Sequence, residues 1–482
     1  MNAPLRRVAI SVLVLFTLLI INVNYIQVVR SDELRNNTSN TRVLAEEYDR
    51  ERGAIVVDGT PIAESVETDD RLTYLRQYPQ GPLYAAVTGY YSLIYSRTGI
   101  ERAENDLLAG SDPRLFVRRL ADLFTGRDPA GGDVVLTLDP AVQQAAMSGI
   151  EGLTGAVVAL DPTTGAVLGM ASTPTYDPTQ LSSHDPEAIR EYWAQLEEVS
   201  PDPRLNRAIA DNFPPGSLFK VIVSAAALES GEYNPETEVP APDILTLPQT
   251  KTTLENFNGS SCDPDERQAL IDALTISCNT AFAQLGIDLG EDRVREMAEA
   301  FGLNGEGFEI PLQVEPSGIG DIESAAALGQ TSIGQRDVRM TPLQAAMVAA
   351  AVAHDGTLMT PYLVDQVRAP DLSVLDETDP DVFSEPISRD VADQLTEMML
   401  SVVENGSGRA AQIPGVQVAG KTGTAQVRED VPDHNWFIGF APADDPQIAV
   451  AIFVANGGGT GGDVSAPIAR QVMQAYLEGR GG

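Results

Sequence analysis

The sequence predicts an α+β protein, in which one antiparallel β-sheet is flanked by helices and accompanied by a helical subdomain. Two observations support this prediction. Short apolar strand patterns occur at residues 156–170 and again after residue 415, whereas residues 185–350 have mostly helical periodicity. Strands at both ends of a segment with helices between them favour a single sheet covered by helices. We expect a small mixed domain and one transmembrane helix to precede this unit.

The composition is that of a folded and strongly acidic protein. With 482 residues, of which 43% are hydrophobic, the chain has room for two or three domains and at least one large core. Its 69 acidic residues against 32 basic ones give a formal charge of −37. So large a negative charge disfavours nucleic acid and anionic lipid surfaces as broad partners, and we expect no nucleic-acid partner.

The uncharged apolar run from Val8 to Val29 predicts a transmembrane helix, since at about 1.5 Å per residue it spans a bilayer. No Ala-x-Ala cleavage pattern follows it, so an uncleaved signal anchor is favoured over a cleaved signal peptide. Arg6 and Arg7 lie at the short N-terminal end, which places that end in the cytoplasm. Residues 1–30 are therefore predicted to form a cytoplasmic stub and a single-pass anchor in the cell membrane, with everything after Arg30 outside.

Residues 31–145 are predicted to form a small non-catalytic N-terminal domain. Residues 31 to about 50 are polar and acidic, as in a stalk. Arg52–Gly59 has the pattern of a strand that ends in an Asp-Gly turn. Gly99-Ile100-Glu101 is expected at a turn, and Gly126–Gly132 has the composition of a linker.

Residues 146–482 are predicted to form the main domain. A β-hairpin opens it, with strands at Ala156–Leu160 and Ala166–Met170 joined by the turn Asp161–Gly165. Later elements follow from periodicity. They are a strongly apolar helix at Leu343–Ala353, strands at Val416–Ala419, Trp436–Phe440 and Ile448–Val454, and an amphipathic helix at Ala466–Leu477.

A serine and a lysine three residues apart, Ser217 and Lys220, share one face of a predicted helix. Pro214, Pro215 and Gly216 suit the approach to that helix, so Ser217 is expected in its first turn, near free backbone N–H groups. The surroundings are almost uncharged and would desolvate Lys220, lowering its pKa and making it a proton acceptor. Alone, this S-x-x-K pattern is equally consistent with an N-cap serine and a surface lysine.

Two further motifs follow in order. Ser277-Cys278-Asn279 interrupts a helical pattern, and Lys421-Thr422-Gly423-Thr424 is expected directly after a strand. Each is weak alone, but S-x-x-K, S-x-N and K-T-G-T in this order form a strong signal. The same three kinds of motif occur in penicillin-binding proteins and class A β-lactamases.

On these motifs the sequence resembles the class B penicillin-binding proteins, most closely the actinobacterial penicillin-binding protein A type, over nearly its whole length. Further similar segments are Asn206-Arg207-Ala208, Ser332-Ile333-Gly334-Gln335, Thr341-Pro342-Leu343-Gln344, Ala419–Gln426 and, in the N-terminal domain, Arg52-Gly53-Ala54-Ile55. Two features depart from the family pattern: Ser96 stands where a glycine is expected, and the N-terminal domain is short.

The resemblance implies a D,D-transpeptidase with a penicillin-binding fold, which cross-links peptidoglycan through a serine acyl-enzyme and is acylated by penicillins. Ser217 would attack the D-Ala-D-Ala carbonyl, with neutral Lys220 as its base. Ser277 would relay the proton to the leaving D-alanine, and Asn279 would orient the peptide and Lys220. The implied role is in cell division or cell-wall growth.

The resemblance also implies a substrate-binding strand. Lys421 would supply positive charge near the substrate carboxylate, to which Thr422 and Thr424 would donate hydrogen bonds, with Gly423 between them. The backbone N–H groups of Ser217 and Thr424 would form the oxyanion hole. Expected partners are peptidoglycan stem peptides, β-lactams and other cell-wall synthesis and division proteins.

Other chemistries are less consistent with the residues. His184, His354 and His434 are mutually remote and lack metal-ligand spacing, so neither a metal nor a Ser-His-Asp triad is expected, and His434 is placed in a turn. The run Gly457–Gly462 lacks the lysine of a phosphate loop and is expected to be a strand-end loop, so no cofactor is predicted. The alternatives are a D,D-carboxypeptidase or β-lactamase, which would pass the acyl group to water, and a non-catalytic scaffold. About 150 residues before the catalytic domain leave no room for a glycosyltransferase.

Cys262 and Cys278 are the two cysteines of the chain. Both follow the anchor and would face an oxidising compartment, where a disulfide can persist. The alternative is a pair of buried, unpaired thiols. A bridge would hold the loop that carries Ser277 and Asn279.

Overall fold

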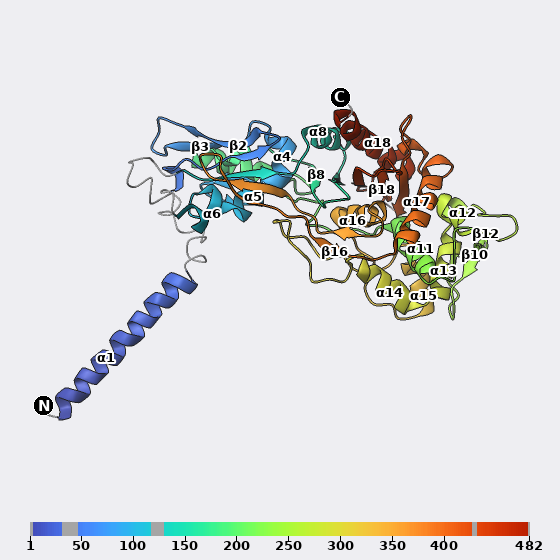
Figure 1. Cartoon of the computed structure of the whole chain (residues 1–482), viewed down its shortest axis with the longest axis horizontal. Coiled ribbons are helices and arrows are strands. Elements are labelled where there is room, and N and C mark those ends of the chain that lie inside the picture. Colours follow the sequence, from blue (N-terminus) through green and yellow to red (C-terminus); the bar gives the residue numbers. More distant parts are fainter. Residues whose placement is uncertain (1–2, 31–46, 117–129, 427–430, 481–482) are drawn as a thin grey trace.

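Two β-sheets and one projecting helix organise the chain in the computed structural model, which describes residues 3–30, 47–116, 130–426 and 431–480 (Figure 1). The predicted stalk therefore lies almost wholly outside the described residues. So does most of the predicted linker, although its last two glycines are described. Gly131 and Gly132 donate backbone hydrogen bonds to Glu51 and Leu107, and so belong to the N-terminal domain.

The projecting helix is α1 (Ala3–Asn24), which continues as a π-helical turn to Val29. The apolar span Leu5–Val29 is 25 residues long and none of it is buried, so by length and composition it can cross a membrane once. Its polar side chains Ser11, Thr17 and Asn24 each hydrogen-bond to the carbonyl four residues earlier. Their polar groups are thus satisfied within the helix, as an apolar environment requires.

The N-terminal domain is built on a six-stranded sheet with the order β15-β14-β6-β1-β2-β3. The bounds are β1 Ile55–Val57, β2 Thr60–Glu67, β3 Tyr74–Gln77, β6 Asp133–Leu136, β14 Val364–Arg368 and β15 Val374–Glu377. β1 and β6 are parallel, and the other pairs are antiparallel. Asp58 and Gly59 join β1 to β2 with φ of 46° and 72°, which confirms the predicted Asp-Gly turn.

The segment around the buried Glu101 differs from the predicted turn. Gly99-Ile100-Glu101 is not a turn but the start of helix α5 (Gly99–Ala103). Glu101 is buried there and accepts hydrogen bonds from the Nε atoms of Arg52 and Arg76, both at 2.6 Å. Ser96, where a glycine was expected, has φ of 62°, a conformation that glycine adopts most easily. The remaining small elements are α4 (Gly81–Thr88), β4 (Tyr91–Ser92), β5 (Ser96–Arg97) and α6 (Asn105–Leu108).

The main domain contains the predicted antiparallel sheet, with five strands in the order β17-β18-β19-β7-β8. The bounds are β7 Gly155–Leu160, β8 Val167–Thr173, β17 Ala419–Ala425, β18 His434–Ala441 and β19 Ile448–Val454. The predicted hairpin and the last two predicted strands are therefore confirmed. His434 is not a turn residue but the first residue of β18, where its Nδ1 accepts a hydrogen bond from the backbone of Asn456.

Alternate residues of the central strands pack on opposite faces of this sheet. Ala156 and Val158 join the core around α11 (Phe219–Glu229) and α16 (Pro342–Ala353), whereas Val157 and Ala159 join the core around α8 (Pro140–Gly149) and α18 (Gly461–Arg480). The sheet is thus covered by helices on both faces, as Figure 1 shows. Every residue of α16 is buried, as expected of a helix that is apolar all round.

Helix α18 begins five residues before its predicted start at Ala466, and includes the last two glycines of the predicted loop. Thr460 and Asp463 explain the early start, because each side chain accepts a hydrogen bond from the other's backbone N–H. This reciprocal cap satisfies donors that the first helical turn leaves free.

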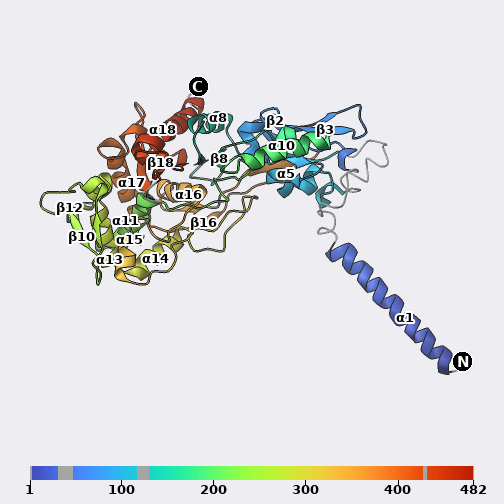
Figure 2. The ribbon, with the colours of Figure 1, turned by 180° about the vertical axis from the view of Figure 1, so that it is seen from behind.

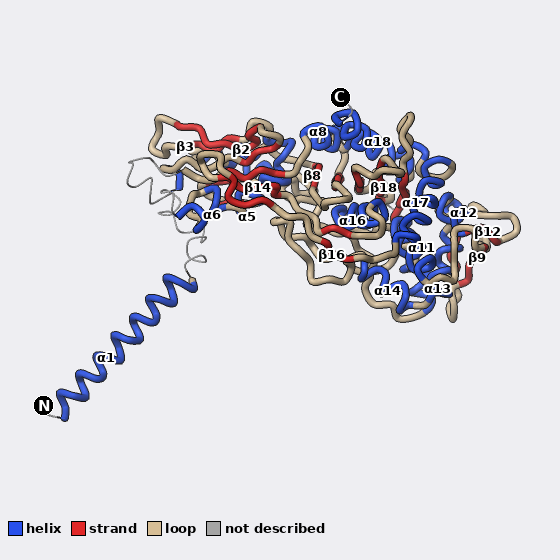
Figure 3. Tube along the Cα trace, in the orientation of Figure 1, coloured by secondary structure: helices blue, strands red, loops and turns tan. Residues whose placement is uncertain are grey.

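A helical subdomain covers the far end of the main domain, away from the six-stranded sheet (Figure 3). Its helices are α12 (Leu270–Thr275), α13 (Asn279–Leu289), α14 (Glu291–Ala300), α15 (Ala325–Thr331) and α17 (Arg389–Glu404). Before α12 lie two small two-stranded sheets that the helical periodicity did not predict. β9 (Glu238–Pro240) pairs with β12 (Arg267–Ala269), and β10 (Ile244–Thr246) pairs with β11 (Thr253–Glu255). β13 (Leu358–Met359) and β16 (Val382–Ser384), which lie before α17, form another two-stranded sheet.

The two domains are interleaved in sequence. β14 and β15 leave the main domain to complete the N-terminal sheet. Helix α10 (Pro186–Glu198), with the short α9 (Pro178–Leu181), packs in turn against Ala85 and Tyr90 of the N-terminal domain (Figure 2). The division expected between residues 145 and 146 falls inside α8, which packs against α18 and β8 of the main domain.

Candidate active site

The S-x-x-K motif lies where a 3₁₀ turn, Gly216–Leu218, runs directly into α11. Gly216 has φ of 54°, and a Cβ there would lie 2.5 Å from the carbonyl oxygen of Thr424, so only glycine fits. Ser217 therefore stands in the first turn, as predicted, directly after the glycine that packs against the end of β17. Its hydroxyl makes no hydrogen bond to another described residue, which leaves it available to a ligand.

Lys220 is fully buried, and three oxygens lie within hydrogen-bond distance of its Nζ. These are the Ser277 carbonyl at 2.7 Å, the Asn279 Oδ1 at 2.8 Å and the Ser277 Oγ at 3.2 Å. None of them carries a negative charge. Burial, and secondly the positive charge of Lys421, hold the pKa of Lys220 well below its usual range. The neutral amine that a proton acceptor requires is therefore favoured.

Ser277 occupies a strained turn between α12 and α13. Its φ of 63° places a non-glycine residue in the left-handed region, which costs on the order of 1–3 kcal/mol and persists where surrounding contacts enforce it. Those contacts are present, because the Ser277 Oγ accepts from Lys421 Nζ at 2.9 Å as well as from Lys220. A hydroxyl oxygen can accept two hydrogen bonds, so the proton of Ser277 remains to be donated.

The K-T-G-T motif corrects a prediction about the sheet. The strand expected at Val416–Ala419 is instead β17, Ala419–Ala425, so the motif lies within the strand rather than after it. The two glycines and two threonines hide the apolar alternation of a strand, and pairing along its whole length with β18 supplies the missing stability. Gly423 is required by close packing, since a Cβ there would lie 2.8 Å from the Pro215 carbonyl oxygen.

The side chains of this strand are held by neighbouring elements. Lys421 is buried, and desolvation lowers its pKa to about 7. Its Nζ also donates to the Thr422 carbonyl at 2.9 Å. The Thr422 hydroxyl lies 2.6 Å from the Ser407 hydroxyl, and the Thr424 hydroxyl accepts from the N–H of Gly461 at 3.2 Å. β17 is an edge strand of the sheet, so its outer side has no strand partner.

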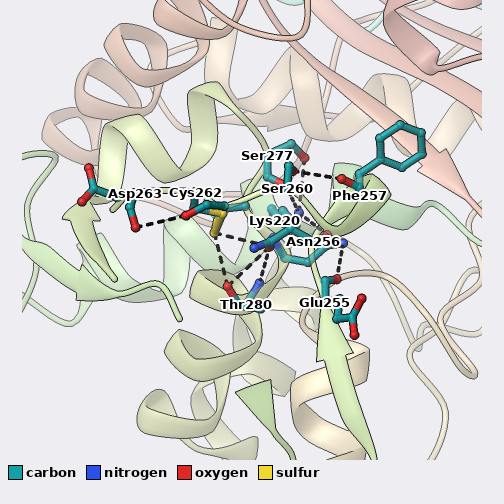
Figure 4. The surroundings of a disulfide bond; sticks show 12 residues. Lys220, Glu255, Asn256, Phe257, Ser260, Cys262, Asp263, Ser277 and Thr280 are labelled. Carbon is teal, nitrogen blue, oxygen red and sulfur yellow. Dashed lines mark hydrogen bonds between the residues drawn. A yellow bond between two sulfur atoms is a disulfide. The ribbon is translucent and has the colours of Figure 1, made fainter. Parts of the chain in front are cut away.

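Cys262 and Cys278 form a disulfide, with their Cα atoms 5.9 Å apart. Figure 4 shows it beside Lys220 and Ser277. The bridge therefore ties the middle residue of S-x-N to the loop that follows β11.

The structure brings Lys220, Ser277, Asn279 and Lys421 into one hydrogen-bonded cluster beside Ser217. Sequence reasoning missed three residues that support this cluster. Asn256 accepts hydrogen bonds from the start of α13, Ser407 contacts Thr422, and Trp436 donates from Nε1 to the Pro214 carbonyl at 2.9 Å. Each acts across more than ten positions of chain and belongs to no short motif, so the sequence carries no local signal for it.

Two family models match the chain. One, described as the penicillin binding protein transpeptidase domain, matches residues 155–474. The other, described as the penicillin binding protein A dimerisation domain, matches residues 52–134. Together they cover the main domain and most of the N-terminal domain.

Curated relatives match over nearly the full length. Peptidoglycan D,D-transpeptidase PbpA of Mycolicibacterium smegmatis is 49% identical over 489 residues, which cover 99% of each chain. The protein of the same name from Mycobacterium tuberculosis is 47% identical over 491 residues, which cover 99% of this chain and 100% of the relative.

Solved structures agree in fold. The ceftriaxone acyl-enzyme of penicillin-binding protein A from M. tuberculosis has a TM-score of 0.88 at 46% identity, covering 90% of this chain and 100% of that one. The penicillin G acyl-enzyme of the same protein has a TM-score of 0.86 at 46% identity, covering 89% and 100%. These matches confirm the fold class and the family predicted from the sequence. The chain belongs to the class B penicillin-binding proteins, the peptidoglycan D,D-transpeptidases of the penicillin-binding protein A type.

Proposed function

We propose that this chain cross-links peptidoglycan stem peptides through an acyl-enzyme on Ser217, and that penicillins acylate the same serine. The observation that carries the proposal is the buried Lys220, three residues after Ser217, surrounded by uncharged acceptors. A serine alcohol needs a base within reach, and a neutral lysine supplies one.

Acylation would proceed in two proton transfers. Lys220 takes the Ser217 proton while Oγ attacks the carbonyl of the penultimate D-alanine, and the backbone N–H groups of Ser217 and Thr424 stabilise the oxyanion. When the intermediate collapses, the C–N bond breaks and the nitrogen of the leaving D-alanine takes a proton. Ser277 can pass it on, since its hydroxyl contacts Lys220 and retains a proton to donate.

The β17 strand would bind the substrate. Lys421 provides positive charge, and Thr422 and Thr424 offer hydroxyl donors to the terminal carboxylate. The unpaired outer side of β17, next to Gly423, can accept an extended peptide as a further strand. The amine of a second stem peptide then attacks the acyl carbonyl, forming the new amide and returning Ser217 to its hydroxyl form.

The chain would act outside the cell membrane. Helix α1 serves as the anchor, and Arg6 and Arg7 keep its N-terminal end in the cytoplasm. Residues 31–145 would form a pedestal for the transpeptidase domain and a contact surface for other cell-wall synthesis and division proteins.

Labelling with a fluorescent penicillin tests the assignment. Full-length protein in detergent is compared with Ser217→Ala and with Ser224→Ala, which removes a buried hydroxyl from the same helix. We expect label on the wild type and on Ser224→Ala, and none on Ser217→Ala. Label that persists on Ser217→Ala would refute the proposal. A stem-peptide donor given with and without an acceptor amine separates transpeptidation from hydrolysis to the carboxylic acid.

A further inference from the structure

The carboxamide of Asn256 contacts the S-x-N segment at the first turn of α13. Asn256 directly follows β11 and is 6% exposed. Its Oδ1 accepts hydrogen bonds from the backbone N–H of Asn279 at 2.9 Å and of Thr280 at 3.1 Å. The Thr280 hydroxyl donates to the same oxygen at 3.4 Å. One distant oxygen thus satisfies donors that the first helical turn leaves free.

These donors fix the orientation of the Asn256 amide. The two backbone N–H groups beside Oδ1 can only donate, so the oxygen, and not the nitrogen, faces the helix. The Nδ2 of Asn256 is buried and has no hydrogen-bond partner among the described residues. An unsatisfied buried donor is unfavourable, so packing alone does not account for an asparagine here. The side chain is used for its acceptor.

The neighbouring residue orients the side chain of Asn279. The Glu255 carbonyl accepts from Asn279 Nδ2 at 3.4 Å, which leaves Asn279 Oδ1 to face Lys220 Nζ at 2.8 Å. Asn256 thus holds the backbone of Asn279, and Glu255 its amide. Figure 4 shows Glu255, Asn256 and Lys220 close together beside the disulfide.

We propose that Asn256 is a positioning residue for the acylation of Ser217, because it fixes Asn279 and, through Asn279, the side chain of Lys220. The proposal rests on the proposed function. Misplacement of a reacting group by about 1 Å can lower a rate on the order of 10²-fold. Loss of one acceptor at Asn256 should therefore slow acylation more than the loss of an ordinary buried hydrogen bond would.

Three variants of the full-length protein in detergent separate positioning from stability. Asn256→Leu keeps the volume without the acceptor, and Asn256→Asp keeps the acceptor. Asn105→Leu is the matched control, because Asn105 is 7% exposed and its Oδ1 accepts from Arg52 in the other domain. For each we would measure the melting temperature and the second-order rate of penicillin G acylation against pH.

Asn256→Leu is expected to slow acylation roughly 10- to 100-fold. The midpoint of its pH profile should move to lower pH, because the Lys220 ammonium loses a fixed acceptor. Asn256→Asp should recover most of the rate at high pH, with its midpoint moved to higher pH, because an added carboxylate favours the ammonium.

Lys421 on β17 is the charged group that acts on Lys220, and no variant changes it. The Glu255 carboxylate is exposed. Asn105→Leu should lower the melting temperature and leave the midpoint unchanged.

The proposal is overturned if Asn256→Leu acylates at the wild-type rate. It is also overturned if the rate of Asn256→Leu falls but the midpoint of its pH profile equals that of Asn105→Leu. If Asn256→Leu does not fold, the midpoint of Asn256→Asp decides, and an unchanged midpoint rejects positioning. Wild type and Ser217→Ala are labelled alongside. Loss of label in Ser217→Ala upholds the proposed function whatever the Asn256 variants do.

Discussion

Lys421 Nζ donates a hydrogen bond of 2.9 Å to the Ser277 hydroxyl, although the two residues lie 144 positions apart in the chain. The bond joins the edge strand β17 to the left-handed turn before α13. Because the Ser277 oxygen also accepts from Lys220, the protonation of either lysine changes the environment of one hydroxyl.

Lys220→Ala should abolish acylation while the protein remains folded, because the proton acceptor is lost from a helix that suits alanine. General-base catalysis contributes roughly 10²- to 10⁴-fold, and the second-order rate of penicillin acylation should fall by that factor. Lys251→Ala, at an exposed lysine, is the control and should leave the rate unchanged. An unchanged rate in Lys220→Ala, with a lowered melting temperature, would instead mark a structural lysine.

Lys421 should make the stability of the protein rise with pH. Burial lowers its pKa from 10.5 to about 7, so below pH 7 the folded state carries the full cost of a buried ammonium. Between about pH 7 and 10.5 the folded lysine is neutral while the unfolded one is charged, and the cost disappears as pH increases. The melting temperatures of the wild type and of Lys421→Met, measured from about pH 6 to pH 9, should converge or cross, with the steeper rise in the wild type. Parallel curves would show that Lys421 does not titrate in this range.

Reduction of the Cys262–Cys278 disulfide should slow acylation more than it lowers the melting temperature. A loop of this length contributes about 3 kcal/mol in the chain-entropy model, but the constraint acts locally on the residues beside Ser277 and Asn279. The acylation rate and the melting temperature would be compared before and after mild reduction.

Thiol counting checks that bridge independently. The denatured, non-reduced full-length protein is alkylated and examined by mass spectrometry. We expect no modified cysteine, and two modified cysteines would reject the disulfide.

Release of the acyl group from penicillin-acylated protein should be very slow, with half-lives far longer than a turnover. A transpeptidase must exclude water so that an amine is the acceptor. Hydrolysis of a chromogenic β-lactam by the full-length protein is the measurement. Rapid turnover would favour the β-lactamase or carboxypeptidase alternative.

Ser407→Ala should weaken the binding of substrate that we propose for β17. The Ser407 and Thr422 hydroxyls share one hydrogen bond of 2.6 Å, so if Thr422 donates to the substrate carboxylate, Ser407 must supply the proton between them. Loss of one such bond should lower the second-order acylation rate roughly 2- to 10-fold.

Ser401→Ala is the matched control for Ser407, because the Ser401 hydroxyl accepts a hydrogen bond from Thr275 and, among the described residues, makes none to β17. Its rate should equal that of the wild type. Equal losses in both variants would show that Ser407 acts only through local packing.

The sequence predicted the elements whose signals are local. The hairpin at β7 and β8, the strand β19 and the apolar helix α16 each carry their periodicity within one short segment. The motif residues Ser217, Lys220, Ser277 and Lys421 were predicted as site residues from residue type and order alone. The distances between these residues could not be predicted from the sequence, because they depend on how the whole chain folds.

The elements that sequence reasoning missed depend on distant partners. β17 is a strand because β18 lies beside it, although its glycines and threonines lack apolar alternation. Gly423 is present because the Pro215 carbonyl approaches closely, and Asn256 caps a helix that begins 23 positions later. Each of these features depends on a contact between two segments that are distant in the chain. A short stretch of sequence contains only one of the two segments, so it carries no signal for the contact.

The six-stranded sheet contains two neighbouring strands, β6 and β14, that are far apart in the chain, and this separation affects the newly synthesised polypeptide. β6 ends at Leu136, and its neighbour β14 begins only at Val364. Synthesis adds about 5–20 residues per second, so β6 waits roughly 10–45 seconds for its partner. Throughout that interval its edge offers unpaired N–H and C=O groups to any other extended chain. Nascent chains that stop before Val364 should therefore aggregate, and a chaperone that shields the β6 edge should raise the yield of complete protein.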